Sequence, residues 1–371
     1  MSDLVTLPMV RWSGVEGRPL VIAGPCSAES EAQVVETARR LQGARVDYLR
    51  AGIWKARTRP ATFEGMGDAA LPWLQRAGRE YGMRTATEVA TAAHVAAALR
   101  HGIDLLWIGA RTTVNPFSVQ EIAEALRGVT VPVLVKNPTS PDLGLWIGAM
   151  ERINRAGVRA LGVIHRGFSV AANHRYRNAP MWELAIEFRR LHPGIPIVTD
   201  PSHITGRRDL VPDIAQRAMD LGLDGLMIEV HPNPDQAWSD AAQQITPERL
   251  SEIIAQLKVR RADSPDADFQ QSLQLLRDRI DHIDHDLIDL LARRMRVVEE
   301  IAGFKRDNNV ATLQVSRWTA LREDRVERAA EMGLVADYAR ALYEVIHRES
   351  LRRQSEIMNA EPAHEPVESK A

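Results

Sequence analysis

Eight short apolar runs recur between residues 19 and 258, and longer segments with a helical period separate them. Near-continuous apolar runs are typical of strands that are buried on both faces, as in parallel sheets. The intervening segments, such as SEAQVVETARRLQG and SVQEIAEALRG, have acidic residues near their starts and a glycine at their ends, as helices do. The apolar runs begin at Pro19, Val46, Met83, Asp104, Val131, Ala160, Ile195 and Gly225.

Eight strand-then-helix units favour a closed barrel over an open sheet. In a (β/α)8 barrel each parallel strand is followed by a helix, and about 250 residues are enough for the whole fold. The number of strands does not by itself prove closure, so an open doubly wound sheet is the alternative.

The pattern changes after Lys258. The segment VRRADSPDADFQ is polar and aperiodic, as expected of a linker. From Ser272 onward, apolar residues step by three and four positions, which indicates a long amphipathic helix with a coiled-coil-like seam. Glycine and proline nearly vanish as far as Ser355, so we expect an all-helical domain. The seam consists of Leu273, Leu276, Ile280, Ile283, Leu287 and Leu290.

The patterns together predict an α/β fold, a (β/α)8 TIM barrel, followed by an all-α helical domain that dimerises. The final segment AEPAHEPVESKA is polar and contains proline, which is typical of a disordered tail. The predicted boundaries are 1–258 for the barrel, 259–271 for the linker, 272–356 for the helical domain and 357–371 for the tail.

Composition excludes several classes of protein. The 371 residues are 45% hydrophobic and 26% charged with a formal net charge of -2, so nothing indicates binding to nucleic acid or to an anionic membrane. Cys26 is the only cysteine, which excludes an intrachain disulfide and favours a reducing compartment. The chain has no signal-like start and no apolar run of membrane-spanning length, so we expect a cytoplasmic protein.

The predicted strand ends carry an unusual set of side chains. Chemistry in a (β/α)8 barrel takes place at the carboxyl ends of the strands. Just past each of the eight apolar runs lies an ionisable or metal-binding residue, which a random surface would rarely provide at every position. These residues are Cys26, Arg50, Glu88, Arg111, Lys136, Arg166, His203 and Glu229.

One subset of these residues could bind a metal ion. A thiolate, an imidazole and two carboxylates suit a borderline divalent cation, and the soft sulfur disfavours Mg²⁺ and Ca²⁺. Mn²⁺ is our first choice for a single bound ion, with Co²⁺, Fe²⁺ and Zn²⁺ as alternatives. Cys26 could instead be a buried apolar residue, and His165 or His231 could replace His203. The candidate ligands are Cys26, His203, Glu229 and Asp240.

A second subset is basic. Six cations in one cleft would repel one another unless a polyanion binds there, and arginine and lysine both match phosphate and carboxylate oxygens. Two phosphate groups, or a phosphate and a carboxylate, would account for this number of cations. Each of the six taken singly could also be a surface residue. They are Arg50, Lys55, Arg57, Arg111, Lys136 and Arg166.

Eight motifs in this region resemble, in order, those of the short (type I-beta) form of 3-deoxy-D-arabino-heptulosonate 7-phosphate (DAHP) synthase. They are AGPCSAES, LRAGIWKARTRPATFEGMG, TEV, WIGARTT, VLVKNP, HRG, TDPSHITGRRDLV and IEVHPNPDQAWSD. The resemblance implies a condensation of phosphoenolpyruvate with erythrose 4-phosphate, and it implies that Cys26, His203, Glu229 and Asp240 are metal ligands. It further implies that phosphoenolpyruvate is held by Arg50, Lys55, Arg111, Lys136 and Arg166, and that the sugar phosphate is bound by Arg57 and Thr58. Glu88 is implied to lie near the reacting centre. The implied catalytic groups are Lys55, Lys136 and Glu88.

One motif departs from this family. The sugar-phosphate motif of the family is usually Lys-Pro-Arg-Thr, and here it reads Lys55-Ala56-Arg57-Thr58. The sister enzyme that uses arabinose 5-phosphate has Lys-Ala-Asn-Arg, so Ala56 is ambiguous. Arg57 and Thr58 follow the erythrose 4-phosphate pattern, and the arabinose 5-phosphate enzyme is the alternative.

The helical segment contains basic residues that one helix cannot bring together. Arg294 interrupts the seam, and Lys305 follows eleven residues later, about three turns along nearly the same face. Arg277 precedes Arg294 by seventeen residues, about 25 Å along the axis. A pocket that contains all three needs a partner helix, most simply from a second chain. The alternative is a non-catalytic dimerisation and sensor module with solvated arginines.

The segment LQLLRDRIDHIDHDLIDLLARRMRVVEEIAGFK resembles the first helix of the all-helical chorismate mutases, whose two-fold dimers share active sites between chains. The resemblance implies that chorismate is rearranged to prephenate, with Arg294 and Lys305 as the catalytic cations. The family commonly has Asp and Glu where this chain has Gln314 and Trp318, and that glutamate contacts the substrate hydroxyl. We also expect prephenate to inhibit the barrel through the helical domain. The implied substrate-binding residues are Arg277 (from the other chain), Arg294, Lys305, Arg317, Ser350 and Gln354.

Overall fold

The computed structural model describes residues 4–55, 62–170, 175–261 and 263–360. Within them the chain divides into two compact units, Met1–Ala262 and Asp263–Ala371. Each unit has its own elements and its own packing.

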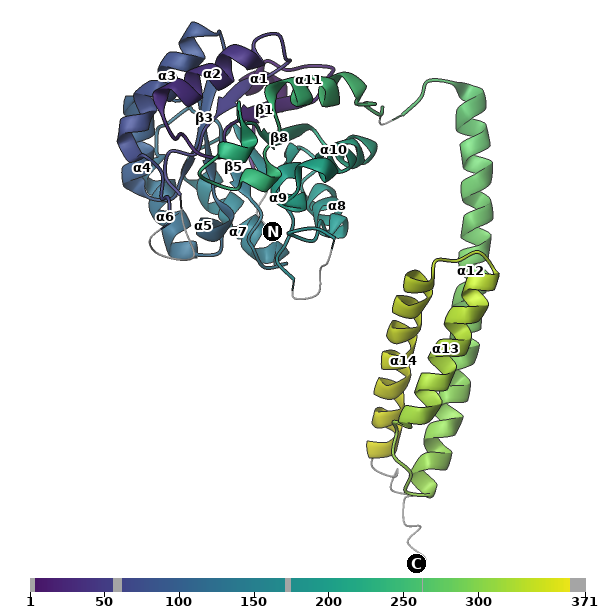
Figure 1. Ribbon diagram of the computed structural model, residues 1–371. Helices are drawn as coiled ribbons and strands as arrows, with labels where there is room; N and C mark the ends of the chain where they lie inside the picture. The colour runs from purple at the N-terminus through teal and green to yellow at the C-terminus, as the bar shows by residue number, and fades with distance from the viewer. Residues whose placement is uncertain (1–3, 56–61, 171–174, 262, 361–371) are drawn as a thin grey trace, which may run out of the picture. The chain divides into compact units, whose positions relative to one another are not determined.

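The first unit is a closed barrel of eight parallel strands in chain order, which confirms the predicted (β/α)8 fold and excludes the open sheet (Figure 1). Closure is made by β1 and β8, whose register pairs Gly24 with Glu229. The strands are β1 (Leu20–Gly24), β2 (Tyr48–Arg50), β3 (Arg84–Val89), β4 (Leu105–Ile108), β5 (Val133–Lys136), β6 (Leu161–His165), β7 (Ile197–Thr199) and β8 (Gly225–Glu229).

Helices surround this barrel on its outside (Figure 1). Several begin at the side-chain caps that such helices favour: the side chains of Ser30, Asn115, Asp142 and Thr246 each accept a backbone N–H of the first turn. The helices are α1 (Met9–Ser13), α2 (Glu31–Leu41), α3 (Leu71–Glu80), α4 (Ala92–Arg100), α5 (Ala110–Thr113), α6 (Pro116–Ala125), α7 (Leu143–Arg155), α8 (Trp182–Leu191), α9 (Pro201–Thr205), α10 (Val211–Asp220) and α11 (Pro247–Gln256), with short 3-10 turns η1 (Gly67–Ala70), η2 (Arg208–Leu210), η3 (Pro234–Gln236) and η4 (Ala241–Gln243).

The side chains of the strands form two apolar cores. Val21 and Ala23 point outward to the helices, whereas Leu20 and Ile22 point into the barrel, as the two-residue period of a strand requires. Trp107 of β4 belongs to the inner core and is fully buried. Side chains fill the interior of the barrel, so it is not a channel, and ligands have access only from an end of the strands.

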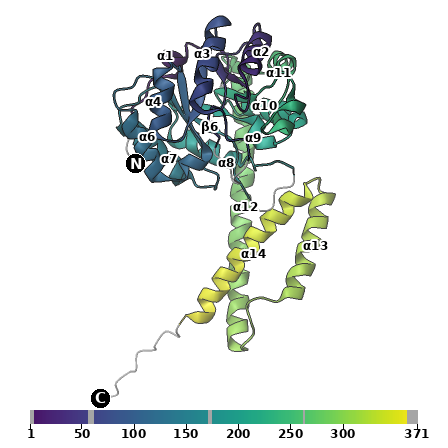
Figure 2. The same cartoon turned by 60° about the vertical axis from the view of Figure 1, so that its left-hand side comes forward.

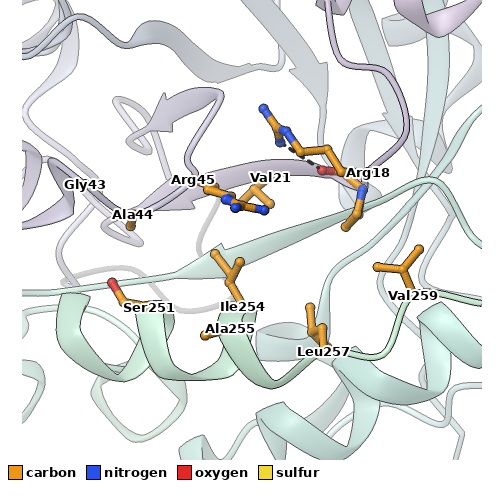
Figure 3. A pocket seen from close by; sticks show the side chains of 11 residues that line it. Arg18, Val21, Gly43, Ala44, Arg45, Ser251, Ile254, Ala255, Leu257 and Val259 are labelled. Atoms are coloured by element: carbon orange, nitrogen blue, oxygen red, sulfur yellow. Dashed lines mark hydrogen bonds between the residues drawn. The ribbon is translucent and has the colours of Figure 1, made fainter.

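One hollow on the described part of this unit does not lie at the strands' carboxyl ends. It measures about 460 Å³ and lies beside the residues that precede and begin β1, against the carboxyl half of α11 (Figure 3). Two basic residues, Arg18 and Arg45, line it, and Arg18 is hydrogen-bonded to Asp47 at 2.9 Å. None of the predicted site residues lines this hollow.

Over residues 263–360, the described part of the second unit, there are three helices (Figure 2): α12 (Ala267–Asp307), α13 (Val315–Glu331) and α14 (Ala336–Asn359). Helix α14 packs against both α12 and α13. Helix α12 begins at Ala267 because the side chain of Asp266 accepts the backbone N–H groups of Asp268 and Phe269.

Helix α12 leaves most of its apolar seam exposed. Of its 41 residues, all of which are described, Val298 and Ala302 are the buried ones. Ile280 is 57% exposed and Ile283 is 64% exposed. The described helices include none that is both long enough and apolar enough to cross a membrane.

Candidate active site

The barrel brings its predicted site residues to one end. Arg50, Lys136 and Glu229 are the last residues of β2, β5 and β8. Cys26 and Arg166 follow β1 and β6 closely, and Glu88 is the second-to-last residue of β3. The remaining two are carried by the short helices after β4 and β7: Arg111 lies in α5 and His203 lies in α9. Arg57 and Thr58 lie outside the described residues.

The four candidate metal ligands are neighbours in this structure. Cys26 Sγ lies 3.4 Å from Asp240 Oδ2, and His203 Nε2 lies 3.8 Å from Glu229 Oε1. Two cations contact the same groups: Lys55 Nζ lies 2.9 Å from Cys26 Sγ, and Arg50 lies 3.2 Å from Glu229 Oε1. Within the described parts of the chain, no three histidine, cysteine or carboxylate side chains are arranged as a formed metal site.

The types of donor atom in this set, a sulfur, an imidazole nitrogen and carboxylate oxygens, nevertheless suit a borderline divalent cation. Glu229 Oε1 is buried and accepts no hydrogen bond from any described residue, while Oε2 accepts one from Gln243 Nε2 at 2.6 Å. Burial, followed by the charge of Glu229, raises the pKa of the Cys26 thiol to about 12. The charge of Lys55 opposes this shift without cancelling it, so a thiolate here needs a further cation such as a bound metal ion.

The two other histidines considered from the sequence make contacts elsewhere. His165 Nε2 donates to the carbonyl oxygen of Pro180 at 2.6 Å. His231 Nε2 lies 3.4 Å from Glu29 Oε2. Neither contact involves a candidate ligand, so His203 is the histidine whose ring lies beside Glu229.

Two residues that the sequence did not single out hold the carboxylates in place. Arg177 donates to Asp240 Oδ1 at 2.9 Å and to Gln243 Oε1 at 2.8 Å, and Gln243 in turn donates to Glu229. Burial would raise the pKa of Asp240, but the charge of Arg177, with that of His203, holds it well below its usual range. The only signal in the sequence was the basic run RYRN that closely follows the HRG motif.

Asp200 connects the candidate ligands to the basic residues. Its Oδ2 lies 2.9 Å from Lys136 Nζ and 2.8 Å from His203 Nδ1, and its Oδ1 accepts the backbone N–H of His203 as the cap of α9. Burial opposes ionisation of this carboxyl, yet the charges of His203 and Lys136 hold its pKa well below the usual value. Asp200 therefore fixes the positions of a candidate ligand and a candidate phosphate-binding lysine together.

Trp107 organises the basic residues at the floor of the site. The Arg50 guanidinium lies 4.9 Å from the centre of the Trp107 ring, and Lys136 Nζ lies 5.9 Å from it. The indole Nε1 donates to Glu88 Oε2 at 2.8 Å. One aromatic ring thus contacts two cations by its π system and one carboxylate by its N–H.

Arg166 is a buried cation held by neutral groups. It donates to Asn178 Oδ1 at 2.8 Å and to Gly167 O at 3.2 Å. Burial lowers the pKa of Arg166 to about 10, Asp200 opposes this shift, and the charges of Arg177 and Arg111 add to it. A buried guanidinium with basic neighbours is the arrangement that an anionic ligand would stabilise.

The helical unit brings together part of its predicted site. Arg294 of α12 donates to Ser350 Oγ of α14 at 2.7 Å, and Lys305 donates to Thr312 O at 2.5 Å. Gln354 is buried one turn beyond Ser350. Arg277 and Arg317 are exposed, and across the described residues neither has a hydrogen bond to Arg294, Ser350 or Gln354.

Comparison with known proteins decides the family. Residues 9–262 match the DAHP synthetase I family. The chain belongs to this family. Residues 276–355 match a second family, chorismate mutase type II. This member of the DAHP synthetase I family therefore carries two enzyme domains, a DAHP synthase and a chorismate mutase, as the sequence motifs predicted.

Relatives and solved structures agree with this assignment of the barrel. Phospho-2-dehydro-3-deoxyheptonate aldolase of Thermotoga maritima is 31% identical over 238 residues, which cover 64% of this chain and 68% of the relative. A DAHP synthase structure from the same organism has a TM-score of 0.59 at 30% identity and covers 65% of this chain and 68% of its own. A 2-dehydro-3-deoxyphosphooctonate aldolase of Rhodopseudomonas palustris (strain HaA2) is 30% identical over 244 residues, 61% of this chain and 82% of the relative.

Proposed function

We propose that the barrel condenses phosphoenolpyruvate with erythrose 4-phosphate to give DAHP and phosphate, and that it needs one divalent metal ion. The observation that carries this proposal is the contact of Lys55 Nζ with Cys26 Sγ at 2.9 Å. Through this contact the sulfur-containing ligand set adjoins the basic residues at the same end of the strands. An anionic substrate held by the cations would lie beside the metal.

Cys26, His203, Glu229 and Asp240 would hold the ion, with Mn²⁺ as the first choice and Co²⁺, Fe²⁺ or Zn²⁺ as alternatives. When bound there, the ion would polarise the aldehyde oxygen as a Lewis acid. Arg177 and Gln243 support the ligand role, because they hold the carboxylates of Asp240 and Glu229 by hydrogen bonds.

The basic residues bind and orient phosphoenolpyruvate. Arg166, fixed by Asn178, and Lys136, fixed by Asp200, hold its phosphate and carboxylate together with Arg111. C3 of phosphoenolpyruvate attacks the aldehyde carbon, water adds at C2, and the bond from C2 to the phosphate oxygen breaks to release phosphate. The same cations, already in position, stabilise the charge of the tetrahedral intermediate.

Lys55 and Glu88 would lie near the reacting centre and transfer protons there. Glu88 is oriented by Trp107 Nε1, and Lys55 by Cys26. Arg57 and Thr58, which lie outside the described residues, would bind the phosphate of the aldehyde.

A comparison of two aldehydes tests the substrate. Phosphate release from phosphoenolpyruvate is measured with erythrose 4-phosphate and with arabinose 5-phosphate, each with Mn²⁺ present. We expect kcat/KM to be higher with erythrose 4-phosphate. The 30% identity to a phosphooctonate aldolase and the ambiguous Ala56 keep arabinose 5-phosphate as the second candidate. A preference for arabinose 5-phosphate would establish that candidate.

We further infer that the helical domain rearranges chorismate to prephenate as a dimer formed through α12. The exposed seam of α12, with Ile280 57% and Ile283 64% exposed, is suited to a second copy of the same helix. Arg277 lies about 25 Å from Arg294 along the axis of the same helix, so it cannot reach the site of its own chain. Arg277 of the second copy would complete that site instead. The rearrangement needs no acid or base, only a folded conformer and cations near the ether oxygen.

We also propose that prephenate bound to the helical domain inhibits the barrel. Linkage requires that prephenate bind the less active state more tightly. Condensation rates with and without prephenate, at concentrations where binding to the helical domain is measured directly, test this. Prephenate formation by the unmodified chain separates a mutase from a domain that serves only for dimerisation and sensing.

A further inference from the structure

One face of α14 carries two buried polar atoms without a partner. His347, Ser350 and Gln354 follow one another at three and four residues, so they line the same side of the helix. His347 Nε2 and Gln354 Oε1 are both buried, and neither has a hydrogen bond to any described residue. Gln354 as a whole is only 7% exposed. Buried polar atoms are normally hydrogen-bonded, so two unpaired ones on one face indicate a place for a polar ligand.

Ser350, which lies between His347 and Gln354 on this face of α14, already contacts a cation. Ser350 Oγ accepts a hydrogen bond from Arg294 at 2.7 Å and donates its proton to Ile346 O. The unpaired atoms of His347 and Gln354 therefore lie on either side of the Arg294 contact.

Trp318 of α13 fixes the plane of the imidazole. The rings of Trp318 and His347 are stacked, with centroids 3.8 Å apart and an angle of 4° between their planes. Trp318 follows Arg317 directly, at the position where the resemblance to the chorismate mutases leads one to expect a glutamate. The stack covers a face of the imidazole, and Nε2 at its edge has no hydrogen bond to any described residue.

His347 is a neutral group beside two cations. Burial lowers the pKa of its imidazole, and the charges of Arg294 and Lys305, both on α12, lower it further. The groups that face it are thus Arg294, Lys305 and the uncharged Trp318. A neutral imidazole offers one N–H and one acceptor nitrogen. Carboxylates will bind to the two cations, whereas an uncharged hydroxyl suits His347.

We propose that His347, held in place by its stack on Trp318, contacts the ring hydroxyl of the substrate in the helical domain and so determines specificity for a hydroxylated dicarboxylate. This assignment rests on the proposed mutase activity and adds the residue that recognises the hydroxyl. Trp318 acts as a positioning residue for His347.

The test compares chorismate with its analogue in which the ring hydroxyl is methylated. The main variant is His347→Phe, which keeps a ring against Trp318 but removes both nitrogens; His347→Ala is the second. We expect either to lower kcat/KM for chorismate by about tenfold, the size of one neutral hydrogen bond. The loss with the methylated analogue should be at most about twofold, because the hydrogen bond is already impaired there.

Trp318 and a neighbouring surface residue supply the controls. Trp318→Phe, which can still stack, should retain more of the discrimination between the two substrates than Trp318→Ala. Arg348→Ala, at an exposed position next to His347, should leave both rates unchanged. Circular dichroism and thermal unfolding check that each variant is folded.

The outcomes separate this assignment from the function on which it rests. An active His347→Phe variant that loses the same factor with both substrates, or loses nothing, would overturn the role of His347 alone. No formation of prephenate by the unmodified chain would overturn the proposed mutase function and the assignment with it.

Discussion

The ammonium nitrogen of Lys55 lies 2.9 Å from the sulfur of Cys26. Cys26 follows β1 and is fully buried, and Lys55 comes from the loop after β2. The two residues join the candidate metal ligands to the basic residues that would hold phosphoenolpyruvate. A divalent cation bound by Cys26 would displace this ammonium group toward the substrate.

His203 and His231 give opposite predictions for metal binding. His203→Gln should lower the affinity of the metal-free protein for Cd²⁺ by about tenfold or more, because it removes a proposed ligand. His231→Gln should leave it unchanged, because His231 contacts Glu29 instead. Since Cys26 is the only cysteine, the ultraviolet absorption of a cadmium thiolate reports on this site alone. Equal affinities in the two variants would exclude His203 from the ligand set.

Arg177 should influence metal affinity without binding the metal. Arg177→Ala removes the hydrogen bonds that hold Asp240 and Gln243, and loss of such support typically lowers metal affinity by about 10- to 100-fold. Calorimetric titration of the metal-free protein with Mn²⁺ measures this loss. Arg175→Ala is the matched control, since Arg175 is exposed and pairs loosely with Asp213. An unchanged affinity of Arg177→Ala would refute the supporting role.

The pair of Lys136 and Asp200 should contribute far more to stability than a surface pair. Lys136→Met leaves a fully buried carboxylate without its ammonium partner, which typically costs about 3–5 kcal/mol. Arg76→Met breaks an exposed pair with Glu31 and should cost less than about 1 kcal/mol. Denaturant unfolding of the barrel measures both. Adding Asp200→Asn to Lys136→Met should recover part of the loss, and a further loss would contradict this account.

Ile283 should be needed for association of the helical domain. Ile283→Lys places a charge on the exposed seam of α12 and should convert the proposed dimer to a monomer in sedimentation experiments. Mutase activity should then fall by about 100-fold or more, because the partner's arginine is lost. Asp281→Lys, at an exposed position off the seam, is the control for added charge. A monomeric variant with full mutase activity would show that one chain suffices.

The barrel was predictable because its signals are local. Near-continuous apolar runs marked all eight strands, and the rule that parallel strands end at one edge placed Arg50, Lys136 and Glu229 together. Trp107 was not recognised, because nothing in the sequence tells which of the apolar residues of β4 faces the basic groups. Its neighbour Leu106 faces the helices instead.

The remaining residues depend on loops whose paths are not encoded in a short motif. Arg177 and Gln243 meet across 66 residues of sequence. Asp200 lies inside the quoted motif TDPSHITGRRDLV, but its double role as helix cap and partner of Lys136 needs β5 and β7 in place. Helix α12 begins at Ala267 rather than near Ser272, because the Asp266 cap, and not the apolar seam, determines its start.

Removal of the metal tests the central claim most directly. Condensation of phosphoenolpyruvate with erythrose 4-phosphate is measured in protein treated with a chelator, with elemental analysis to establish the metal content, and again as Mn²⁺ is added back. We predict that activity is lost with the metal, returns in proportion to the ion bound up to one per chain, and is not restored in Cys26→Ser at the same concentration. Full turnover by a metal-free sample of the unmodified protein would contradict the account.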